Sequence, residues 1–170
     1  MFRPSQAVLD VVGTLVRLGL AAVWLVSGSI KISSPGQTYL AVKAYQVLPG
    51  GLVHPVATAL PLLELALGAF LLLGLLTRVA ASVSAVLLLL FIAGVSQSWA
   101  RGLTIDCGCF GGGGQVAQGQ TQYPQEIARD VGFLVLACWL IVRSRTRIAL
   151  DGWLRAGNAQ AEHHSETERI

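Results

Sequence analysis

Residues 63–76 read LELALGAFLLLGLL, and residues 83–95 read VSAVLLLLFIAGV. Together the two stretches contain one charged residue, Glu64. Both are longer and more uniformly apolar than a buried strand, and with their flanks each reaches the roughly 20 residues that a helix needs to cross a bilayer. The sequence therefore predicts membrane-spanning helices at Pro55–Leu76 and Val79–Trp99.

The composition of the whole chain agrees with a lipid environment. Charged residues make up 12% of the 170 residues, about half of the roughly 25% found in ordinary soluble domains, and the mean hydropathy is +0.63. Disorder over most of the chain is excluded, because it requires low hydrophobicity and high charge. Nucleic-acid binding is not indicated, because the net charge is only +3 and no Lys/Arg run alternates with aromatic residues.

Two further segments complete a predicted all-α bundle of four transmembrane helices. The first span is Val8–Ile30. Its apolar stretch is too long for a signal peptide and Arg17 interrupts it, so we expect it to be retained. The fourth span is Pro124–Val142, whose clean apolar run is short and is preceded by Arg129 and Asp130.

Basic residues predict the orientation of the bundle. With both chain ends inside, the inner side carries more Lys and Arg than the outer side, as the positive-inside rule requires. The inner residues are Arg3, Arg78, Arg143, Arg145, Arg147 and Arg155, and the outer residues are Lys31, Lys43 and Arg101. We expect a membrane domain at residues 1–155 and a polar, disordered cytoplasmic tail at residues 156–170.

The loop between the third and fourth spans contains IDCGCFGGGG, residues 105–114. One glycine separates Cys107 from Cys109, and Gly108 can adopt the backbone angles that a disulfide between them requires. Such a bond closes a very short loop, contributes only about 1.6 kcal/mol of chain entropy, and is expected to be strained and labile. The loop is predicted to face the outside, where thiols are oxidised. We therefore predict a redox-active pair.

The predicted reaction is thiol–disulfide exchange, and the chain is then a candidate thiol–disulfide oxidoreductase. A thiolate of a partner attacks one sulfur, forms a mixed disulfide, and is released when the second cysteine resolves it. Lys31 and Arg101 would favour a thiolate if they approach the pair, whereas Asp106 would oppose it. The direction of electron flow and the oligomeric state are left open.

Other interpretations of the cysteines also remain open. The pair can form a purely stabilising disulfide, although this bond would join no two helices. It can also be two inert thiols. A metal site would combine the two thiols with His54 and Asp106, a spacing unlike known zinc patterns. Cys138 in the fourth span is either a relay thiol or a packing residue.

Four charged residues fall within or at the edge of the predicted spans: Arg17, Glu64, Arg129 and Asp130. An unpaired charge at the bilayer centre costs at least about 2.5–3.5 kcal/mol, so we expect them to be paired. Counting along the helices places Arg17 and Glu64 at similar depth, where they can meet, and places Lys31 near Asp130. This polar network either sets the helix registry or forms a pocket that binds a small molecule or carries protons.

These residues resemble the MauE/DoxX family of small four-helix membrane proteins. The resembling features are Arg17, Ser27–Gly28 and Lys31 in the first span, Glu64 and Arg78 around the second, and Arg129–Asp130 at the start of the last. The sequence DCGCFG at residues 106–111 resembles the MauE branch in particular.

The resemblance implies a bacterial plasma-membrane protein that supports the maturation of exported proteins beside a thioredoxin-like partner. In MauE relatives this role concerns the disulfide-rich small subunit of methylamine dehydrogenase, and DoxX relatives are linked to quinol oxidase complexes, which makes a quinone a candidate cofactor. An alternative function is a non-catalytic subunit, or a quinone-binding scaffold, with incidental cysteines. A small transporter is disfavoured, because the sequence has no inverted repeat.

Overall fold

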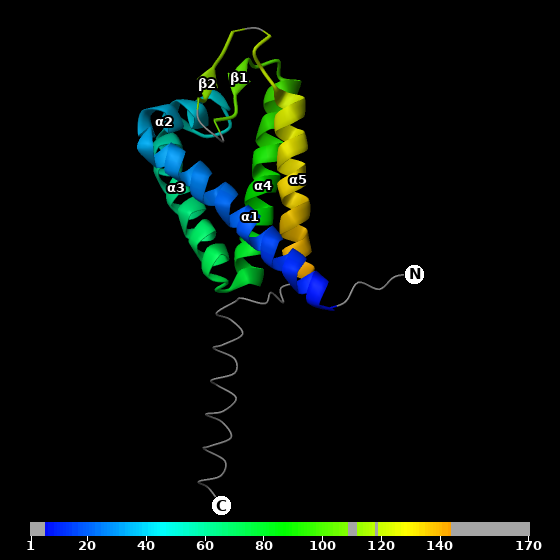
Figure 1. Cartoon of the computed structure of the whole chain (residues 1–170). Coiled ribbons are helices and arrows are strands. Elements are labelled where there is room, and N and C mark those ends of the chain that lie inside the picture. The colour runs from blue at the N-terminus through cyan, green and yellow to red at the C-terminus, as the bar shows by residue number, and fades with distance from the viewer. Residues whose placement is uncertain (1–5, 109–111, 118, 144–170) are drawn as a thin grey trace, which may run out of the picture.

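The computed structural model describes residues 6–108, 112–117 and 119–143, which form five helices and one pair of short strands (Figure 1). The strands pair antiparallel, with Ile105 opposite Gln115. The tail predicted at residues 156–170 lies outside the described residues. The elements are α1 (Gln6–Ser33), α2 (Pro35–Ala44), α3 (Gly50–Leu73), α4 (Thr77–Ala100), β1 (Ile105–Asp106), β2 (Gly114–Gln115) and α5 (Tyr123–Val142).

Among the described helices, α1, α3 and α4 are long and apolar enough to cross a membrane. This agrees with the first three predicted spans and with a membrane protein. Helix α5 is not in this group, because its first half carries Glu126, Arg129 and Asp130. The predicted fourth transmembrane span is therefore a helix, but its crossing of the bilayer stays a prediction.

Helix α1 has 28 residues. At 1.5 Å per residue it is about 42 Å long, which exceeds the roughly 30 Å hydrocarbon core of a bilayer. Figure 1 shows it running obliquely across the other long helices. Large apolar side chains point outward from the bundle, among them Leu15, Leu90 and Val135, each more than half exposed. In a membrane protein these side chains face lipid.

The main helix contacts are those of α1 with α3 and of α4 with α5. Helices α1 and α3 approach closely at two glycines. A Cβ on Gly28 would lie 2.9 Å from Leu65 Cγ, and one on Gly68 would lie 2.6 Å from Leu25 Cγ. Small residues at such positions allow transmembrane helices to pack tightly. These contacts determine how α1 and α3 are aligned along their lengths.

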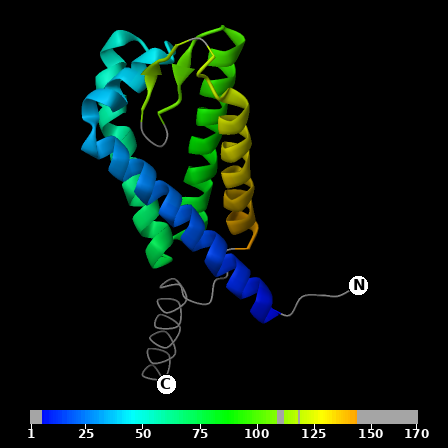
Figure 2. The ribbon, with the colours of Figure 1, turned by 45° about the horizontal axis from the view of Figure 1, so that its top comes forward.

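One end of the bundle holds α2 and the strand pair, and we call it the hairpin end (Figures 1 and 2). The ends of α1 and α4 and the starts of α3 and α5 lie there, while the turn between α3 and α4 lies at the opposite end. Neither α2 nor the strands were predicted from the sequence. Pro35 begins α2 at a position where proline's missing N–H costs nothing.

Candidate functional site

Cys107 follows β1 directly and lies at the hairpin end, with 8% of its surface exposed. The hydroxyl of Tyr45, just after α2, donates to the carbonyl oxygen of Cys107 at 3.1 Å. The hydroxyl of Tyr123, the first residue of α5, donates to the carbonyl of Leu103 and accepts from the amide of Ile105. Two tyrosines therefore hold the segment before and at Cys107 against the ends of α2 and α5.

Two structural features favour glycine at position 108. Its φ is +68°, and a Cβ there would lie 2.8 Å from the Cβ of Ala41 on α2. Its amide donates to Asp106 Oδ1 at 2.9 Å, which holds the turn. Cys109 lies outside the described residues, so the predicted disulfide with Cys107 stays a prediction.

Glu126, which sequence analysis did not select, joins the predicted Cys107 and Asp106. The sulfur of Cys107, a carboxylate oxygen of Asp106 and a carboxylate oxygen of Glu126 all lie within 4.8 Å of one another. We call these three residues the sulfur–carboxylate cluster. One feature of the sequence could have identified Glu126. It lies three residues before Arg129, a spacing that places both side chains on one side of a helix.

Arg129 supplies positive charge to the sulfur, because its Nη2 lies 3.7 Å from Cys107 Sγ. The sequence had indicated Lys31 or Arg101 for this role. Lys31 is bonded to Glu64 instead, and Arg101 donates to the side chain of Gln46. A guanidinium at this distance favours a negative charge on sulfur.

Burial is the largest influence on Glu126 and raises the pKa of its carboxyl above the ordinary value. Hydrogen bonding with Cys107 acts in the opposite direction, Asp106 adds to the increase, and Arg129 reduces it. Glu126 lies in the first turn of α5, ahead of the apolar part of that helix. Its carboxyl therefore takes up a proton more readily than an ordinary glutamate carboxyl does.

The predicted alternative of a metal site with His54 is not supported by the geometry. The ring of His54 lies against that of Tyr39, with centroids 6.3 Å apart, and His54 does not belong to the sulfur–carboxylate cluster. Among the described residues the cluster offers three donor atoms, and Cys109, the second thiol of the predicted metal site, lies outside them. The Arg129 guanidinium on Cys107 also opposes a second cation there.

Lys31 and Glu64 form a buried ion pair between α1 and α3. Lys31 Nζ lies 2.7 and 2.9 Å from the two carboxylate oxygens of Glu64 and 2.6 Å from Ser27 Oγ. The two side chains are 7% and 0% exposed. The predicted pairing of Arg17 with Glu64 is therefore wrong, because α1 and α3 are aligned differently from the depth count.

Arg17 instead binds the end of α3. Its Nη1 donates to the carbonyl oxygens of Leu71 at 2.7 Å and Leu72 at 3.2 Å. The last carbonyls of a helix have no partner within the helix, and a cation there also interacts favourably with the helix dipole. Arg17 is 2% exposed, and from α1 it caps the C-terminal end of the neighbouring helix α3.

Asp130 pairs with its neighbour Arg129, whose Nε lies 3.2 Å from Oδ1. The contact predicted between Lys31 and Asp130 is replaced by these two separate ion pairs, although Lys31 remains close enough for a Coulombic interaction with Asp130. Cys138 is exposed, so it is not a packing residue of the interior. It lies about 14 Å along α5 from Arg129, which separates it from Cys107.

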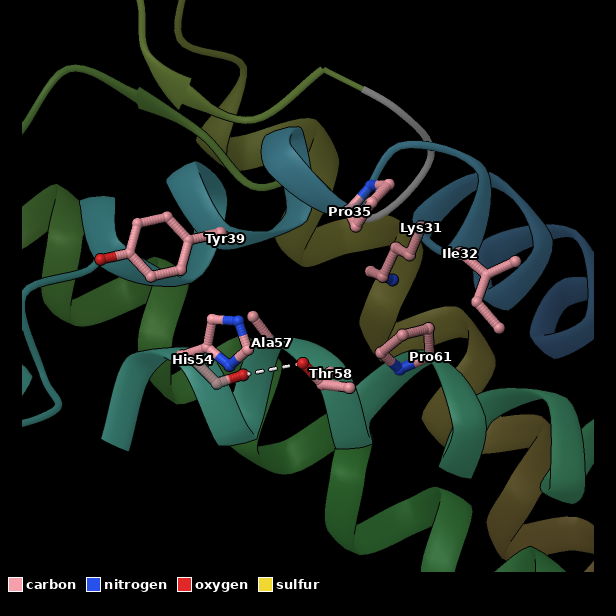
Figure 3. A pocket seen from close by; sticks show the side chains of 8 residues that line it. All are labelled: Lys31, Ile32, Pro35, Tyr39, His54, Ala57, Thr58 and Pro61. Atoms are coloured by element: carbon pink, nitrogen blue, oxygen red, sulfur yellow. Dashed lines mark hydrogen bonds between the residues drawn. The ribbon is translucent and has the colours of Figure 1, made fainter. Parts of the chain in front are cut away.

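A cavity of about 110 Å³ lies between the end of α1, α2 and α3 (Figure 3). The rings of Tyr39 and His54 lie on one side of it, and Thr58 donates to the carbonyl of His54 at 3.0 Å. The lining residues are Lys31, Ile32, Pro35, Tyr39, His54, Ala57, Thr58 and Pro61. A second cavity of about 190 Å³ also contacts Lys31 and reaches Gly108 of the cysteine loop. Lys31 therefore lies between the first cavity and that loop.

The sequence was compared with known proteins. Residues 9–143 match the family described as methylamine utilisation protein MauE. A methylamine utilization protein MauE from Methylophilus methylotrophus is 38% identical over 99 residues, which cover 58% of this chain and 52% of the relative. One from Paracoccus denitrificans is 35% identical over 99 residues, 58% of this chain and 53% of the relative.

The chain thus spans about half the length of the curated relatives it matches. No solved structure matches it significantly. The family match extends from α1 to the residue after α5 and includes every charged residue of the described site. Because this match covers well over half of the sequence, the chain belongs to the MauE family of membrane proteins.

Proposed function

We propose that this chain is a membrane-embedded thiol–disulfide exchange protein whose redox pair is Cys107 and Cys109. The observation that carries the proposal is the environment of the Cys107 sulfur. A guanidinium lies 3.7 Å from it and two carboxylates lie beside it, on a segment anchored by two tyrosines. A purely structural disulfide needs no charged groups around its sulfurs. A thiol that exchanges disulfides needs neighbouring groups that stabilise the thiolate and move its proton.

The proposed orientation places the hairpin end outside a bacterial plasma membrane and both chain ends inside. Support comes from Arg78, at the turn between α3 and α4, and from Arg143 after α5, since cationic loops favour the cytoplasm. In this arrangement the apolar part of α5 enters the bilayer beside α4, and the turn that holds Glu126 stays at the outer surface. The cysteine loop then lies where disulfides form.

The proposed partner is an exported protein of thioredoxin fold, and the proposed outcome is disulfide formation in secreted clients. The relatives bear the name methylamine utilization protein MauE. We therefore extend the proposal to an accessory role in methylamine utilisation, with an exported methylamine-oxidising enzyme as one client.

Serine variants test this proposal. Cys107→Ser and Cys109→Ser are each expected to abolish client maturation, because a complete exchange cycle requires both sulfurs. The variant that lacks only the resolving cysteine should accumulate a mixed disulfide with the partner, because its release requires the second sulfur. Cys138→Ser is the matched control and should leave both unchanged. In intact cells, a membrane-impermeant thiol reagent should label the loop cysteines only after reduction. Undiminished maturation in the Cys107→Ser strain would overturn the exchange function.

A second candidate function is quinone binding. The bound quinone would either accept electrons from the cysteine pair, or the chain would serve only as a quinone-binding scaffold. The cavity in Figure 3 favours it, because the Tyr39 ring and several apolar side chains line it beside transmembrane helices. The polar side chains of Lys31, His54 and Thr58 complete the lining. His54 would donate to a quinone oxygen, and Tyr39 would cover the ring.

A photoreactive quinone analogue tests this candidate. His54→Ala is expected to weaken labelling about tenfold, the equivalent of one lost hydrogen bond. Leu62→Ala, a change at an exposed position on the same helix that does not line the cavity, should have no effect. Equal labelling of the His54 variant and the parent would reject this cavity as the quinone site.

A further inference from the structure

Exchange at Cys107 must move a proton, because the thiolate and not the thiol attacks a disulfide. The Cys107 residue is only 8% exposed, so bulk water has limited access to it. A group of the protein itself is therefore needed to accept the proton.

Glu126 meets the geometric requirement. One of its carboxylate oxygens lies within 4.8 Å of Cys107 Sγ. Its Oε2 is buried and has no hydrogen-bond partner among the described residues. The other nearby carboxylate, Asp106, already accepts from the amide of Gly108 and holds the turn. Glu126 thus combines hydrogen bonding to Cys107 with one buried oxygen that has no partner among the described residues, whereas Asp106 Oδ1 is engaged in the turn.

We propose that Glu126 accepts the proton of Cys107 during disulfide exchange and returns it when the reaction reverses; this inference rests on the proposed function. The proton moves from Sγ to the Glu126 carboxylate, and the thiolate attacks one sulfur of a disulfide. A new S–S bond forms, the attacked S–S bond breaks, and its electron pair leaves on the second sulfur, which takes the proton from Glu126. Resolution by the second cysteine, whose proton passes to the partner sulfur released in this step, leaves this chain oxidised and the partner reduced by two electrons. The same steps in reverse, with Glu126 returning the proton to Cys107, leave the partner oxidised, as disulfide formation in clients requires.

Arg129 complements this role, because it stabilises the charge that forms on sulfur while Glu126 takes the proton. The surrounding charged and titratable groups come from several elements. Asp106 faces Glu126 from the end of β1 and Cys107 from the residue after it, and Arg129 and Tyr123 lie on α5 itself. Asp130 and Lys31 lie deeper in the bundle, and Arg101 at the end of α4 is bonded to Gln46.

The test uses the full-length protein in lipid nanodiscs with Cys109→Ser and Cys138→Ser, which leaves Cys107 as the one remaining cysteine of three. The probe is glutathione disulfide, whose leaving thiol also needs a proton, and mass spectrometry follows glutathionylation from pH 6 to about 9.5, a range that spans ordinary thiol pKa values. Glu126→Gln is expected to slow the reaction at least about tenfold at neutral pH, since general acid–base catalysis contributes about 10²–10⁴-fold. The difference should shrink at high pH, where hydroxide removes the proton.

The sign of the effect separates proton transfer from simple electrostatics. If Glu126 were only a negative neighbour, Glu126→Gln would ease thiolate formation and speed the reaction. Asp106→Asn, which keeps the acceptor for Gly108 and removes one negative charge beside the sulfur, is the comparison variant and should raise the rate, because it changes the electrostatics without removing the proposed proton acceptor. An equal or faster rate in Glu126→Gln overturns the proposal.

Two further measurements keep the result interpretable. If Glu126→Gln does not fold, Glu126→Asp is measured instead, and its retracted carboxylate should lower the neutral-pH rate several-fold; an unchanged rate overturns the proposal. Because glutathione disulfide replaces the natural partner, the two proposals fail separately. Normal client maturation in Cys107→Ser cells would reject the exchange function even where Glu126→Gln slows glutathionylation.

Discussion

Replacing Glu64 by leucine is expected to lower the free energy of unfolding by about 3–5 kcal/mol, because it leaves the Lys31 ammonium buried without its carboxylate. Glu64 is 0% exposed and accepts from both Lys31 and Ser27. The measurement is denaturant-induced unfolding of the purified protein in mild detergent, followed by circular dichroism. Accumulation of the protein in membranes should fall in parallel.

The double variant Lys31→Met/Glu64→Leu is the decisive control. Replacing both members of a buried ion pair by apolar residues of similar size is often neutral or stabilising, so the double variant should recover most of the lost stability. A single variant that loses less than about 1 kcal/mol would show that the pair contributes no more than an exposed one. A stable double variant that also supports client maturation would assign the pair to helix packing alone.

Replacing Arg17 by leucine is expected to cost about 3 kcal/mol. The guanidinium donates two hydrogen bonds to the last turn of α3, and bonds to charged groups contribute about 1.5–3 kcal/mol each. The carbonyls of Leu71 and Leu72 would lose that partner at a depth where lipid cannot replace it. Unfolding in detergent measures the loss, and Arg17→Lys, which keeps the charge but not the planar fork, should recover part of it.

Arg78→Leu provides the matched control for Arg17→Leu. It makes the same chemical change at an exposed arginine one turn beyond the end of α3, and it should alter stability by no more than about 0.5 kcal/mol. If both leucine variants were equally stable, Arg17 would not cap α3 as described. If both were equally unstable, loss of positive charge at this end of the bundle, and not capping, would be the cause.

The two buried arrangements have a common origin in the alignment of α1 against α3. Leu25 packs on Gly68 and Leu65 packs on Gly28. In this antiparallel register the start of α1 meets the end of α3, which brings Arg17 to Leu71. The same register brings Lys31 to Glu64. The predicted depths came from counting residues at about 1.5 Å each within the spans Val8–Ile30 and Pro55–Leu76, whereas α1 has 28 residues and runs obliquely (Figure 1).

The cysteine site shows a similar division between local and long-range information. That Gly108 turns the chain between two cysteines was visible in the sequence, because only glycine tolerates such backbone angles easily. Glu126 was not visible as a partner of Cys107, since 18 residues, including a glycine-rich stretch, lie between them in the sequence. Tyr45 and Tyr123 bring these parts together by hydrogen bonds to the backbone near Cys107.

The sequence by itself determined that this is a helical membrane protein of the MauE family with a Cys-Gly-Cys loop, because apolar run length, charge content and a short motif are all local properties of the chain. Only the tertiary structure decided which charges pair, that α2 and a strand pair cover one end, and that Glu126 and Arg129 lie beside the Cys107 sulfur. These outcomes depend on how helices rotate and slide against one another. That alignment follows from the close fit of side chains such as Leu25 against Gly68, which no single segment of the sequence specifies.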